Sequence, residues 1–336
     1  MKIKQNIRLS EYNTFKTGGN AKFFCEVKNE GELIEAKKFA KNNNLKFIVI
    51  GNGSNLLIKD EDYLGLVIKM SIKGKDIDSK NDVYTIVSTC AGESFDGFIS
   101  FVVSKGLSGI ENLWNIPGTV GASVVQNIGA YGTEVKDYIV SVEGIDADSL
   151  NKFIYKNENC NFGYRESTFK KNKNLIITKV FFKLNNAFIP NLEYPALKDY
   201  FLDKKNISIK EVIKAIGKIR KNKLPDWKVL GTAGSFFKNP IISEKEYSDI
   251  LLKYPSLPKY LAETGFVKIP LGFVLDKICG LKGFKIGKVG LYEKQSLIIV
   301  NYGGASYFEI NNFAKIIEEK VYEKIKIKIE REVEVI

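Results

Sequence analysis

The sequence predicts an α+β fold, with two mixed lobes followed by a third domain. In the first two thirds of the chain, short apolar runs typical of buried strands are mixed with amphipathic segments typical of helices. Near residue 206 the pattern changes, and helices with clear capping signals become prominent. At 336 residues the chain is long enough for two or three domains, each with its own core.

The first lobe opens with a strand, a helix and a second strand. Leu33, Ala36 and Ala40 recur at helical spacing and justify the helix. The second strand is a continuous apolar run that ends in a glycine turn. We expect strands at 22–27, 45–50 and 65–70, and a helix at 32–44.

The second lobe begins with a strand and a helix that Ser94 can cap and Gly106 can end. A long irregular run at 107–137 follows, and then strands resume. We expect strands at 82–92, 137–147, 151–156 and 174–184, and a helix at 93–106.

The third domain carries two capping boxes, Ser208 with Glu211 and Ser243 with Glu246, each before a helical pattern. The last eleven residues alternate apolar and charged, which predicts a strand exposed on one face. We expect helices at 208–226, 243–255, 270–280 and 306–325, and strands at 295–301 and 326–336.

Composition excludes several classes of protein. No window approaches eighteen uninterrupted apolar residues, so we expect no membrane-spanning helix, and the first residues lack a signal-peptide core, so we expect a cytoplasmic protein. The formal charge is +12, but the lysines are spread along the chain and not gathered into a stripe. Only four residues are arginine, which draws attention to Arg165, because lysine cannot replace its planar guanidinium.

The chain contains no histidine, which excludes a Ser-His-Asp triad, a Cys-His pair and a His-ligated zinc site. The four cysteines are widely spaced and form no metal-like cluster, so we expect reduced thiols in or near the core and no metal. Acid–base chemistry would fall to Ser, Tyr, Lys and carboxylates, and redox chemistry would need a cofactor.

Two glycine-rich stretches have unusual backbone chemistry. The stretch "GNGSNLL" at 51–57 follows a strand, but it lacks the third glycine and the helix of a dinucleotide-binding fingerprint. The stretch "IPGTVGASVVQNIGAYG" at 116–132 is too apolar for an ordinary exposed loop. Both suit close backbone approach to a large ligand with phosphates, although simple turns would also explain them.

Further motifs complete a pattern that resembles the UDP-N-acetylenolpyruvoylglucosamine reductase family, also called UDP-N-acetylmuramate dehydrogenases, in its longer form with a tyrosine loop. The motifs occur in the order of that family and span nearly the whole chain. They are "NTFKTGG" (13–19), "GNGSNLL" (51–57), "IPGTVGA" and "QNIGAYG" (116–132), "GYRES" (163–167), "KLPD" (223–226), "GTAGSFFKNP" (231–240) and "IEREVEVI" (329–336).

The resemblance implies a two-lobed FAD-binding domain of the vanillyl-alcohol-oxidase type, followed by an α+β substrate-binding domain. It divides the chain into lobes at 1–70 and 71–205, a substrate domain at 206–326 and a returning strand at 327–336. The residues at the family's FAD-binding positions are Asn52, Gly53, Ser54, Asn55, Leu56, Pro117, Gly118, Thr119, Gly121, Ala122, Asn127, Ile128, Gly129 and Ala130.

The resemblance also implies a reaction in peptidoglycan precursor synthesis. NADPH gives hydride to the flavin, which passes it to C3 of the enolpyruvyl group of the UDP-linked sugar. Ser235, the serine of "GSFFKNP", matches the family's donor of a proton to C2, and burial of Phe236 and Phe237 would hold its backbone. Arg165 and Glu332 match the pair that stabilises the enolate-like charge.

Five other residues match positions of the family's substrate site. Tyr164 matches a residue that lies near flavin and substrate in the family. Tyr194 lies on the insertion of the longer form, where a tyrosine folds over the diphosphate, and Pro195 departs from the glycine that usually follows it. The five residues are Tyr164, Tyr194, Lys223, Asn239 and Gln295. The resemblance implies a small-molecule partner, UDP-N-acetylglucosamine enolpyruvate, with no nucleic acid, membrane or obligate protein partner.

Two alternatives stay open at this point. One is another FAD oxidoreductase of the same fold with a different substrate, which the motifs beyond residue 160 disfavour. The other is a basic nucleic-acid-binding protein without catalysis, which predicts clustered basic residues and a steep salt dependence of binding.

Overall fold

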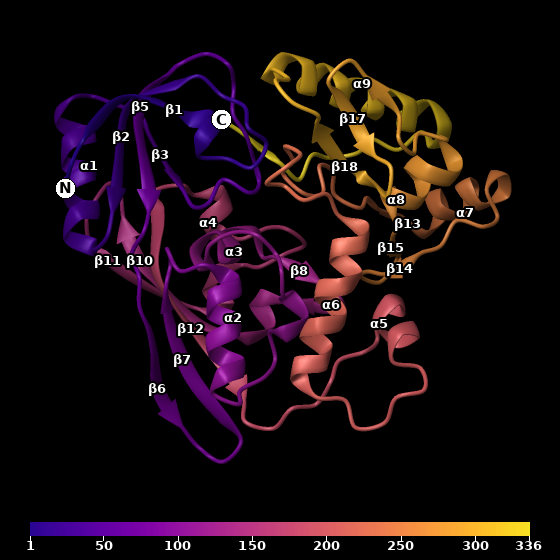
Figure 1. The fold of residues 1–336 in the computed structure, drawn as a ribbon, viewed down its shortest axis with the longest axis horizontal. Coiled ribbons are helices and arrows are strands. Elements are labelled where there is room, and N and C mark those ends of the chain that lie inside the picture. The colour runs from indigo at the N-terminus through magenta and orange to yellow at the C-terminus, as the bar shows by residue number, and fades with distance from the viewer. The chain divides into compact units, whose positions relative to one another are not determined.

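The computed structural model describes residues 1–336, which divide into two compact units (Figure 1). Unit 1 contains residues 1–7, 21–52 and 63–220, and unit 2 contains residues 8–20, 53–62 and 221–336. Neither unit is continuous in sequence, because two short N-terminal segments belong to unit 2.

A four-stranded sheet and one helix form the first part of unit 1 (Figure 1). The strand order is β1-β2-β5-β3, and β5 pairs in parallel with both β2 and β3. The helix α1 begins after its cap Asn29 and buries Leu33, Ala36 and Ala40. The elements are β1 (Lys4–Arg8), β2 (Asn20–Val27), α1 (Glu30–Asn42), β3 (Phe47–Ile50) and β5 (Tyr63–Met70).

An antiparallel five-stranded sheet, in the order β11-β10-β12-β7-β6, forms the second part. Its strands are β6 (Lys75–Lys80), β7 (Tyr84–Cys90), β10 (Ile139–Asp146), β11 (Lys152–Lys156) and β12 (Leu175–Asn185). The helices of this part are α2 (Phe95–Ser104), α3 (Val120–Gln126), α4 (Thr168–Lys171), α5 (Pro195–Tyr200) and α6 (Ile209–Lys223).

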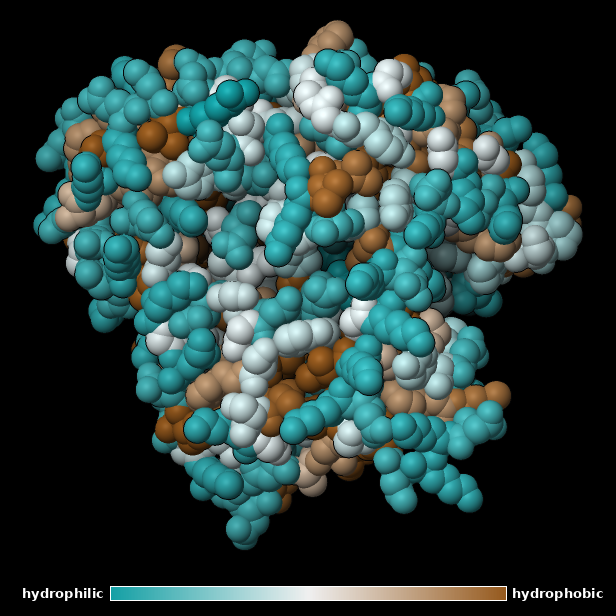
Figure 2. Space-filling model, viewed as in Figure 1, coloured by the Kyte–Doolittle hydropathy of each residue, from teal (hydrophilic) through white to brown (hydrophobic).

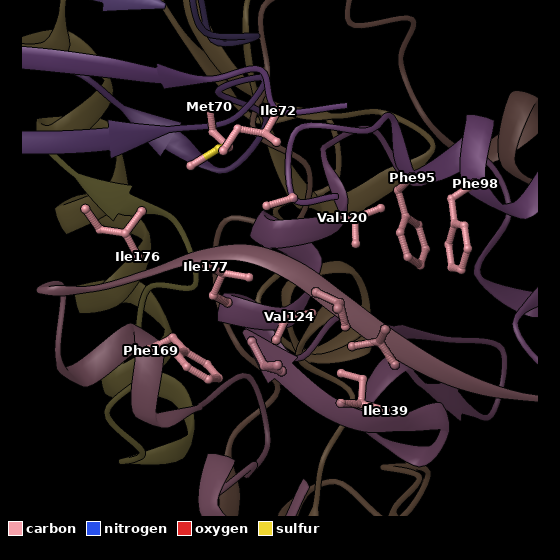
Figure 3. Packing of buried hydrophobic residues seen from close by; sticks show 14 of the residues in the cluster. Met70, Ile72, Phe95, Phe98, Val120, Val124, Ile139, Phe169, Ile176 and Ile177 are labelled. Atoms are coloured by element: carbon pink, nitrogen blue, oxygen red, sulfur yellow. The ribbon is translucent and has the colours of Figure 1, made fainter. Parts of the chain in front are cut away.

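One hydrophobic cluster joins both sheets of unit 1 into a single core. Side chains from α2, α3 and β12 converge in it, and the Phe98 and Phe182 rings lie 4.8 Å apart between centroids (Figure 3). Burial of this apolar surface is the main stabilising term for such a core. The four-stranded and five-stranded sheets are therefore packed around a shared interior.

Helix α6 packs in unit 1 through a small separate cluster. Its residues Val212, Ala215 and Ile216 are buried against Leu197 and Phe201 of the α5 region. The division between the units crosses α6 after Arg220. The composition break near residue 206 and the packing break are thus different points of the chain.

Unit 2 is built on short sheets and several helical segments. The long helix α9 lies against β17 and β18, and buries residues such as Ile310, Phe313 and Ile317 at helical spacing (Figure 1). The elements are β4 (Leu56–Leu57), β13 (Ile241–Ser243), α7 (Glu244–Lys253), β14 (Tyr260–Leu261), β15 (Phe266–Lys268), α8 (Leu271–Phe273), a π-helical turn (Val274–Ile278), β16 (Lys285–Ile286), β17 (Val289–Tyr292), β18 (Gln295–Asn301), α9 (Tyr307–Ile325) and β19 (Glu334–Val335).

Short elements complete the chain: the 3-10 turns Leu9–Glu11, Glu111–Leu113, Val135–Tyr138 and Asn157–Cys160, and the two-residue strands β8 (Gly129–Ala130) and β9 (Thr133–Glu134).

Most expected elements are confirmed near their expected positions, and all three expected caps form. Ser94 caps α2, and capping boxes form at Ser208 with Glu211 and at Ser243 with Glu246. Cys25 and Cys160 are buried, and Cys90 and Cys279 are half-buried, as the sequence predicts. Hydrophilic residues cover most of the face shown in Figure 2. No helix has the length and apolar character needed to span a membrane.

The expected strand at 326–336 is wrong in extent. Only Glu334–Val335 forms a strand, β19, which pairs in parallel with β4. Residues before it alternate in burial as expected, with Ile329 buried and Glu330 exposed. However, single backbone hydrogen bonds to the segment after Ser235, and not a sheet, hold this part of the tail.

Candidate active site

The first glycine stretch is a tight turn that crosses from unit 1 to unit 2 after Asn52. Gly53 has a φ of +66°, and an added Cβ would lie 2.1 Å from the Tyr12 carbonyl oxygen and 2.6 Å from Cα of Asn13. Only glycine therefore fits this position. On the unit 1 side, Nδ2 of Asn52 donates a hydrogen bond to the Gly118 carbonyl at 3.3 Å.

The second glycine stretch contains a helix that the sequence analysis did not predict. Helix α3 starts after its cap Thr119, whose Oγ1 accepts a hydrogen bond from the Ala122 N–H at 3.4 Å, and ends at Asn127 with a φ of 44°. Because this helix has only seven residues and is rich in small side chains, hydrophobic periodicity does not reveal it. The N-cap threonine was the available signal.

Within unit 1 the two stretches approach each other closely. A Cβ on Gly51 would lie 2.5 Å from Oγ1 of Thr119, and a Cβ on Gly121 would lie 2.8 Å from Cβ of Ala91. Asn52, Pro117 and Ala122 remain exposed beside these glycines. Short side chains and exposed backbone of this kind fit a flat dinucleotide such as FAD, whose phosphates backbone N–H groups can hold.

Arg165 lies against the end of the second stretch. Its guanidinium donates hydrogen bonds to the carbonyls of Asn127 (3.3 Å) and Gly129 (2.8 Å), and lies 5.2 Å from the centre of the Tyr164 ring. Its own φ is 58°, which is uncommon for a residue with a side chain. The structure thus brings Arg165, Tyr164 and the "QNIG" segment together.

The loop that carries Tyr194 lies on the same part of unit 1. The Tyr194 and Tyr131 rings meet edge to face, with centroids 5.0 Å apart. Nδ2 of Asn112 donates to the carbonyls of both Tyr131 and Asn191, each at 2.9 Å. Asn112 therefore ties the tyrosine loop to the second glycine stretch.

A second arginine, Arg220, contacts the residue just before this stretch, and the sequence analysis did not single it out. Nε of Arg220 donates to the Asn115 carbonyl at 3.1 Å, while the Asp96 carboxylate accepts from the Asn115 N–H at 2.7 Å. Burial raises the pKa of Asp96, and Arg220 partly opposes that effect. The sequence analysis applied the scarcity of arginine only to Arg165. The same signal applies to Arg220, which is another of the four arginines.

In unit 2, Ser235 lies at the start of an extended segment held on both sides. Ser235 forms an isolated bridge with Ile298, and the Phe236 N–H donates to the Leu297 carbonyl at 2.8 Å. On the other side, the Glu332 N–H donates to the Phe236 carbonyl at 2.8 Å. Ser235 and Glu332, far apart in sequence, thus lie on neighbouring backbone segments.

The two phenylalanines after Ser235 are buried, as the sequence predicts. Phe236 is 0% exposed and Phe237 is 1% exposed, with ring centroids 5.0 Å apart, whereas Ser235 itself is exposed. Gly234 before it has a φ of +78°. The segment therefore anchors its backbone in the core and presents one hydroxyl at the surface of the unit.

The first glycine turn joins this group through Asn55. Its Nδ2 donates to the Glu332 carbonyl at 3.2 Å, and its own carbonyl accepts from the Glu334 N–H at 3.0 Å. Unit 2 alone thus brings together Asn55, Ser235 and Glu332.

Two expected substrate residues meet at α8. Oδ1 of Asn239 accepts a hydrogen bond from the Leu271 N–H at 2.9 Å, and Oε1 of Gln295 lies 3.0 Å from where a Cβ on Gly272 would be. Lys223 is the exposed last residue of α6.

The two buried cysteines are not reactive thiolates. Burial raises the pKa of Cys25 and Cys160 to about 12, so that neither is a thiolate at neutral pH. The structure contains no cluster of three or more His, Cys, Asp or Glu side chains that could hold a metal ion.

Two family models match the chain. Residues 21–150 match "FAD binding domain", and residues 225–336 match "UDP-N-acetylenolpyruvoylglucosamine reductase, C-terminal domain". These matches support the expected two-lobed FAD-binding domain of the vanillyl-alcohol-oxidase type and the α+β domain after it.

Known proteins are similar to this chain over nearly its whole length. The UDP-N-acetylenolpyruvoylglucosamine reductase of Flavobacterium johnsoniae is 41% identical over 100% of both chains. That of Neisseria gonorrhoeae is 38% identical over 98% of this chain and 96% of its own. The crystal structure of the Thermus caldophilus enzyme superposes with a TM-score of 0.70 at 25% identity, covering 100% of this chain and 99% of that one. The chain therefore belongs to the UDP-N-acetylenolpyruvoylglucosamine reductase family and is an FAD-binding oxidoreductase.

Proposed function

We propose that this chain reduces UDP-N-acetylglucosamine enolpyruvate to UDP-N-acetylmuramate, with NADPH as the hydride source, as a cytoplasmic step of peptidoglycan precursor synthesis. The observation that carries the proposal is the grouping in unit 2, where an exposed serine followed by two buried phenylalanines lies beside the segment of Glu332 and the glycine turn of Asn55. The full-length similarity to enzymes named for this substrate supports it.

FAD is bound in this proposal by the backbone and short side chains of the two glycine stretches. The residues assigned to FAD are Asn52, Gly53, Ser54, Asn55, Leu56, Pro117, Gly118, Thr119, Gly121, Ala122, Asn127, Ile128, Gly129 and Ala130. When bound, FAD supplies the hydride carrier between NADPH and C3 of the enolpyruvyl group.

Ser235 donates the proton that C2 receives, so that hydride and proton complete the reduction of one double bond. A hydroxyl is a weak acid, and it protonates a strongly basic carbon quickly only when it is held at the right distance. The buried Phe236 and Phe237 and the backbone bonds on both sides of the segment supply that rigidity.

Arg165 and Glu332 stabilise the negative charge that grows on the substrate carboxylate. A guanidinium can hold a carboxylate through two parallel hydrogen bonds, and Glu332 is assigned a shared hydrogen bond with the same carboxylate. The other substrate contacts are assigned to Tyr164 beside Arg165, Tyr194 at the diphosphate and Lys223 and Asn239 at the nucleotide sugar. Gln295 is assigned to the lining of the substrate site.

The domain division that accompanies this function is FAD-binding lobes at 1–70 and 71–205, a substrate domain at 206–326 and a C-terminal tail at 327–336, in which only Glu334–Val335 forms a strand. The tail hydrogen bonds that join Glu332 to Phe236 and to Asn55 support a separate role for the last ten residues.

The substitution Ser235→Ala tests the function. We expect flavin reduction by NADPH to stay nearly normal, and reoxidation by the enolpyruvyl substrate to become slower by a factor on the order of a hundred, because general acid catalysis contributes that much. Stopped-flow absorbance of the flavin measures the two half-reactions separately.

Ser248→Ala is the control, because Ser248 is exposed on α7 and its hydroxyl bonds only within that helix, to the Glu244 carbonyl. It should leave both half-reactions unchanged. Equal loss of both half-reactions in Ser235→Ala, or no loss of reoxidation, would refute the assigned role.

A further inference from the structure

The motif "NTFKTGG" at 13–19 has no role in the function proposed so far. The structure places it in unit 2, where Thr14 is buried with 6% of its surface exposed. All three hydrogen-bonding groups of Thr14 have partners on two functional loops. Those loops are the first glycine turn and the segment that leads to Ser235.

The contact with the glycine turn is a backbone hydrogen bond. The Thr14 N–H donates to the Gly53 carbonyl at 3.1 Å. The same turn lies so close to Tyr12 and Asn13 that Gly53 has no room for a side chain. The position of the turn is therefore set by the segment that carries Thr14.

The contact with the serine segment is a pair of bonds to Thr232. Oγ1 of Thr14 donates to the Thr232 carbonyl at 2.6 Å, and the Thr232 N–H donates to the Thr14 carbonyl at 3.0 Å. Oγ1 of Thr232 then accepts from the Gly234 N–H at 3.2 Å. This chain of bonds ends on the residue next to Ser235.

Neighbouring contacts make the arrangement rigid. Nδ2 of Asn301 donates to the Phe15 carbonyl at 3.0 Å, and the backbones of Asn301 and Gly231 exchange two hydrogen bonds at 2.8 and 3.0 Å. A Cβ on Gly231 would lie 2.6 Å from the Phe15 carbonyl oxygen. Residues 14 and 15 are thus closely packed against the start of the serine segment.

We propose that Thr14 is a positioning residue, which fixes the serine segment to the glycine turn and so sets the place of the Ser235 hydroxyl relative to the bound flavin. The inference rests on the proposed function, since it concerns the proton donor of that reaction. Thr14 acts only through Gly53, Thr232 and Gly234.

The hydroxyl of Thr14 is the part that substitution can remove cleanly. Valine has nearly the same shape, so Thr14→Val deletes only the bond to the Thr232 carbonyl, which is left buried without that donor. A displacement of about 1 Å at a reacting group can cost about a hundredfold in rate. The loss should therefore fall on the proton-transfer step.

We expect Thr14→Val to bind FAD with an unchanged absorbance spectrum and to be reduced by NADPH within about twofold of the normal rate. Reoxidation at saturating substrate should be slower by about tenfold to a hundredfold, which is a loss in kcat and not in KM. Thr14→Ser, which keeps the hydroxyl, should recover most of the rate.

The control is Thr85→Val, which deletes an equally buried hydroxyl whose bond, to Oδ1 of Asn186 at 2.7 Å, lies in unit 1. It should leave reoxidation unchanged. Normal reoxidation in Thr14→Val, an equal loss in Thr85→Val, or no recovery in Thr14→Ser would overturn the inference.

If Thr14→Val fails to fold, Thr232→Val decides, because it removes the acceptor of the Gly234 N–H further along the same chain of bonds. Selective slowing of reoxidation supports the inference, and a normal rate overturns it. The proposed function fails separately. If Ser235→Ala reoxidises normally, the proton donor is misassigned, whereas a slow Ser235→Ala with a normal Thr14→Val removes only the role of Thr14.

Discussion

At the scale of single residues, Arg165 shows most clearly why side-chain shape matters here. Its planar guanidinium reaches two carbonyls, of Asn127 and Gly129, and packs against the Tyr164 ring at the same time. The ammonium of lysine is a compact charge that cannot reproduce this fork. Arg165 therefore shapes the second glycine stretch in addition to the charge that it contributes.

We expect Arg165→Lys to lower turnover on the order of a hundredfold, because it removes a preorganised hydrogen-bond donor that stabilises the developing negative charge. The free energy of unfolding should fall by no more than about 3 kcal/mol, the upper range for a hydrogen bond that involves a charged group. Steady-state rates and thermal melts of the purified variant measure the two effects.

Arg8→Lys is the matched control, since Arg8 is exposed and its Nε contacts only Oγ of Ser10. It should change neither turnover nor stability. A loss of stability in Arg165→Lys large enough to explain the loss of turnover would assign Arg165 a purely structural role.

At the scale of elements, helix α7 owes its start to a capping box. Oγ of Ser243 accepts from the Glu246 N–H at 3.2 Å, and the Glu246 carboxylate accepts from the Ser243 N–H at 2.9 Å. The hydrogen bond from the Ser243 hydroxyl lowers the pKa of Glu246. The box therefore stabilises the helix most when Glu246 is ionised.

We expect Ser243→Ala to lower the free energy of unfolding by about 1 kcal/mol at pH 7. The folded-state pKa of Glu246 lies below its ordinary value of 4.5, so its contribution is complete above that pH and is lost as pH falls. The loss of stability in Ser243→Ala should therefore be smaller in acid. It should not vanish, because the hydrogen bond from the Glu246 N–H is lost at every pH. Urea unfolding at pH 7 and pH 3 measures it.

Ser248→Ala, in the middle of the same helix, should change stability by less than about 0.5 kcal/mol. A deficit in Ser243→Ala that grows on acidification would contradict the sign argued here.

At the scale of the whole molecule, the two units have separate hydrophobic cores. A ligand that binds only the folded chain stabilises it by mass action. The chain crosses between the units inside the first glycine turn, after Asn52. Cofactor binding and stability should therefore be strongly coupled.

We expect removal of FAD to lower the thermal midpoint, and added FAD to raise it again. The free energy of unfolding should increase by about 1.4 kcal/mol for each tenfold rise in free FAD above the dissociation constant. Scanning fluorimetry of the apoprotein across an FAD titration measures this. Flavin mononucleotide, which lacks the adenylate half, should stabilise less. A thermal midpoint that does not change with the FAD concentration would contradict the expectation.

The sequence by itself determined those features that depend on short-range patterns. Helices such as 306–325 repeat apolar residues at helical spacing, capping boxes need only four residues, and the ordered motifs identify the family. The absence of histidine and the pairing of Ser235 with two phenylalanines also needed no coordinates.

Only the tertiary structure decided which distant segments meet. Residues 8–20 and 53–62 belong to unit 2, Glu332 lies beside Phe236, and Thr14 joins Gly53 to Thr232. The contacts of Glu332 and Thr14 are isolated hydrogen bonds between segments far apart in the chain. Such bonds leave no periodicity in the sequence. For the same reason the tail at 326–336 looked like a strand, because alternation reports which side is buried but not whether a partner strand is present.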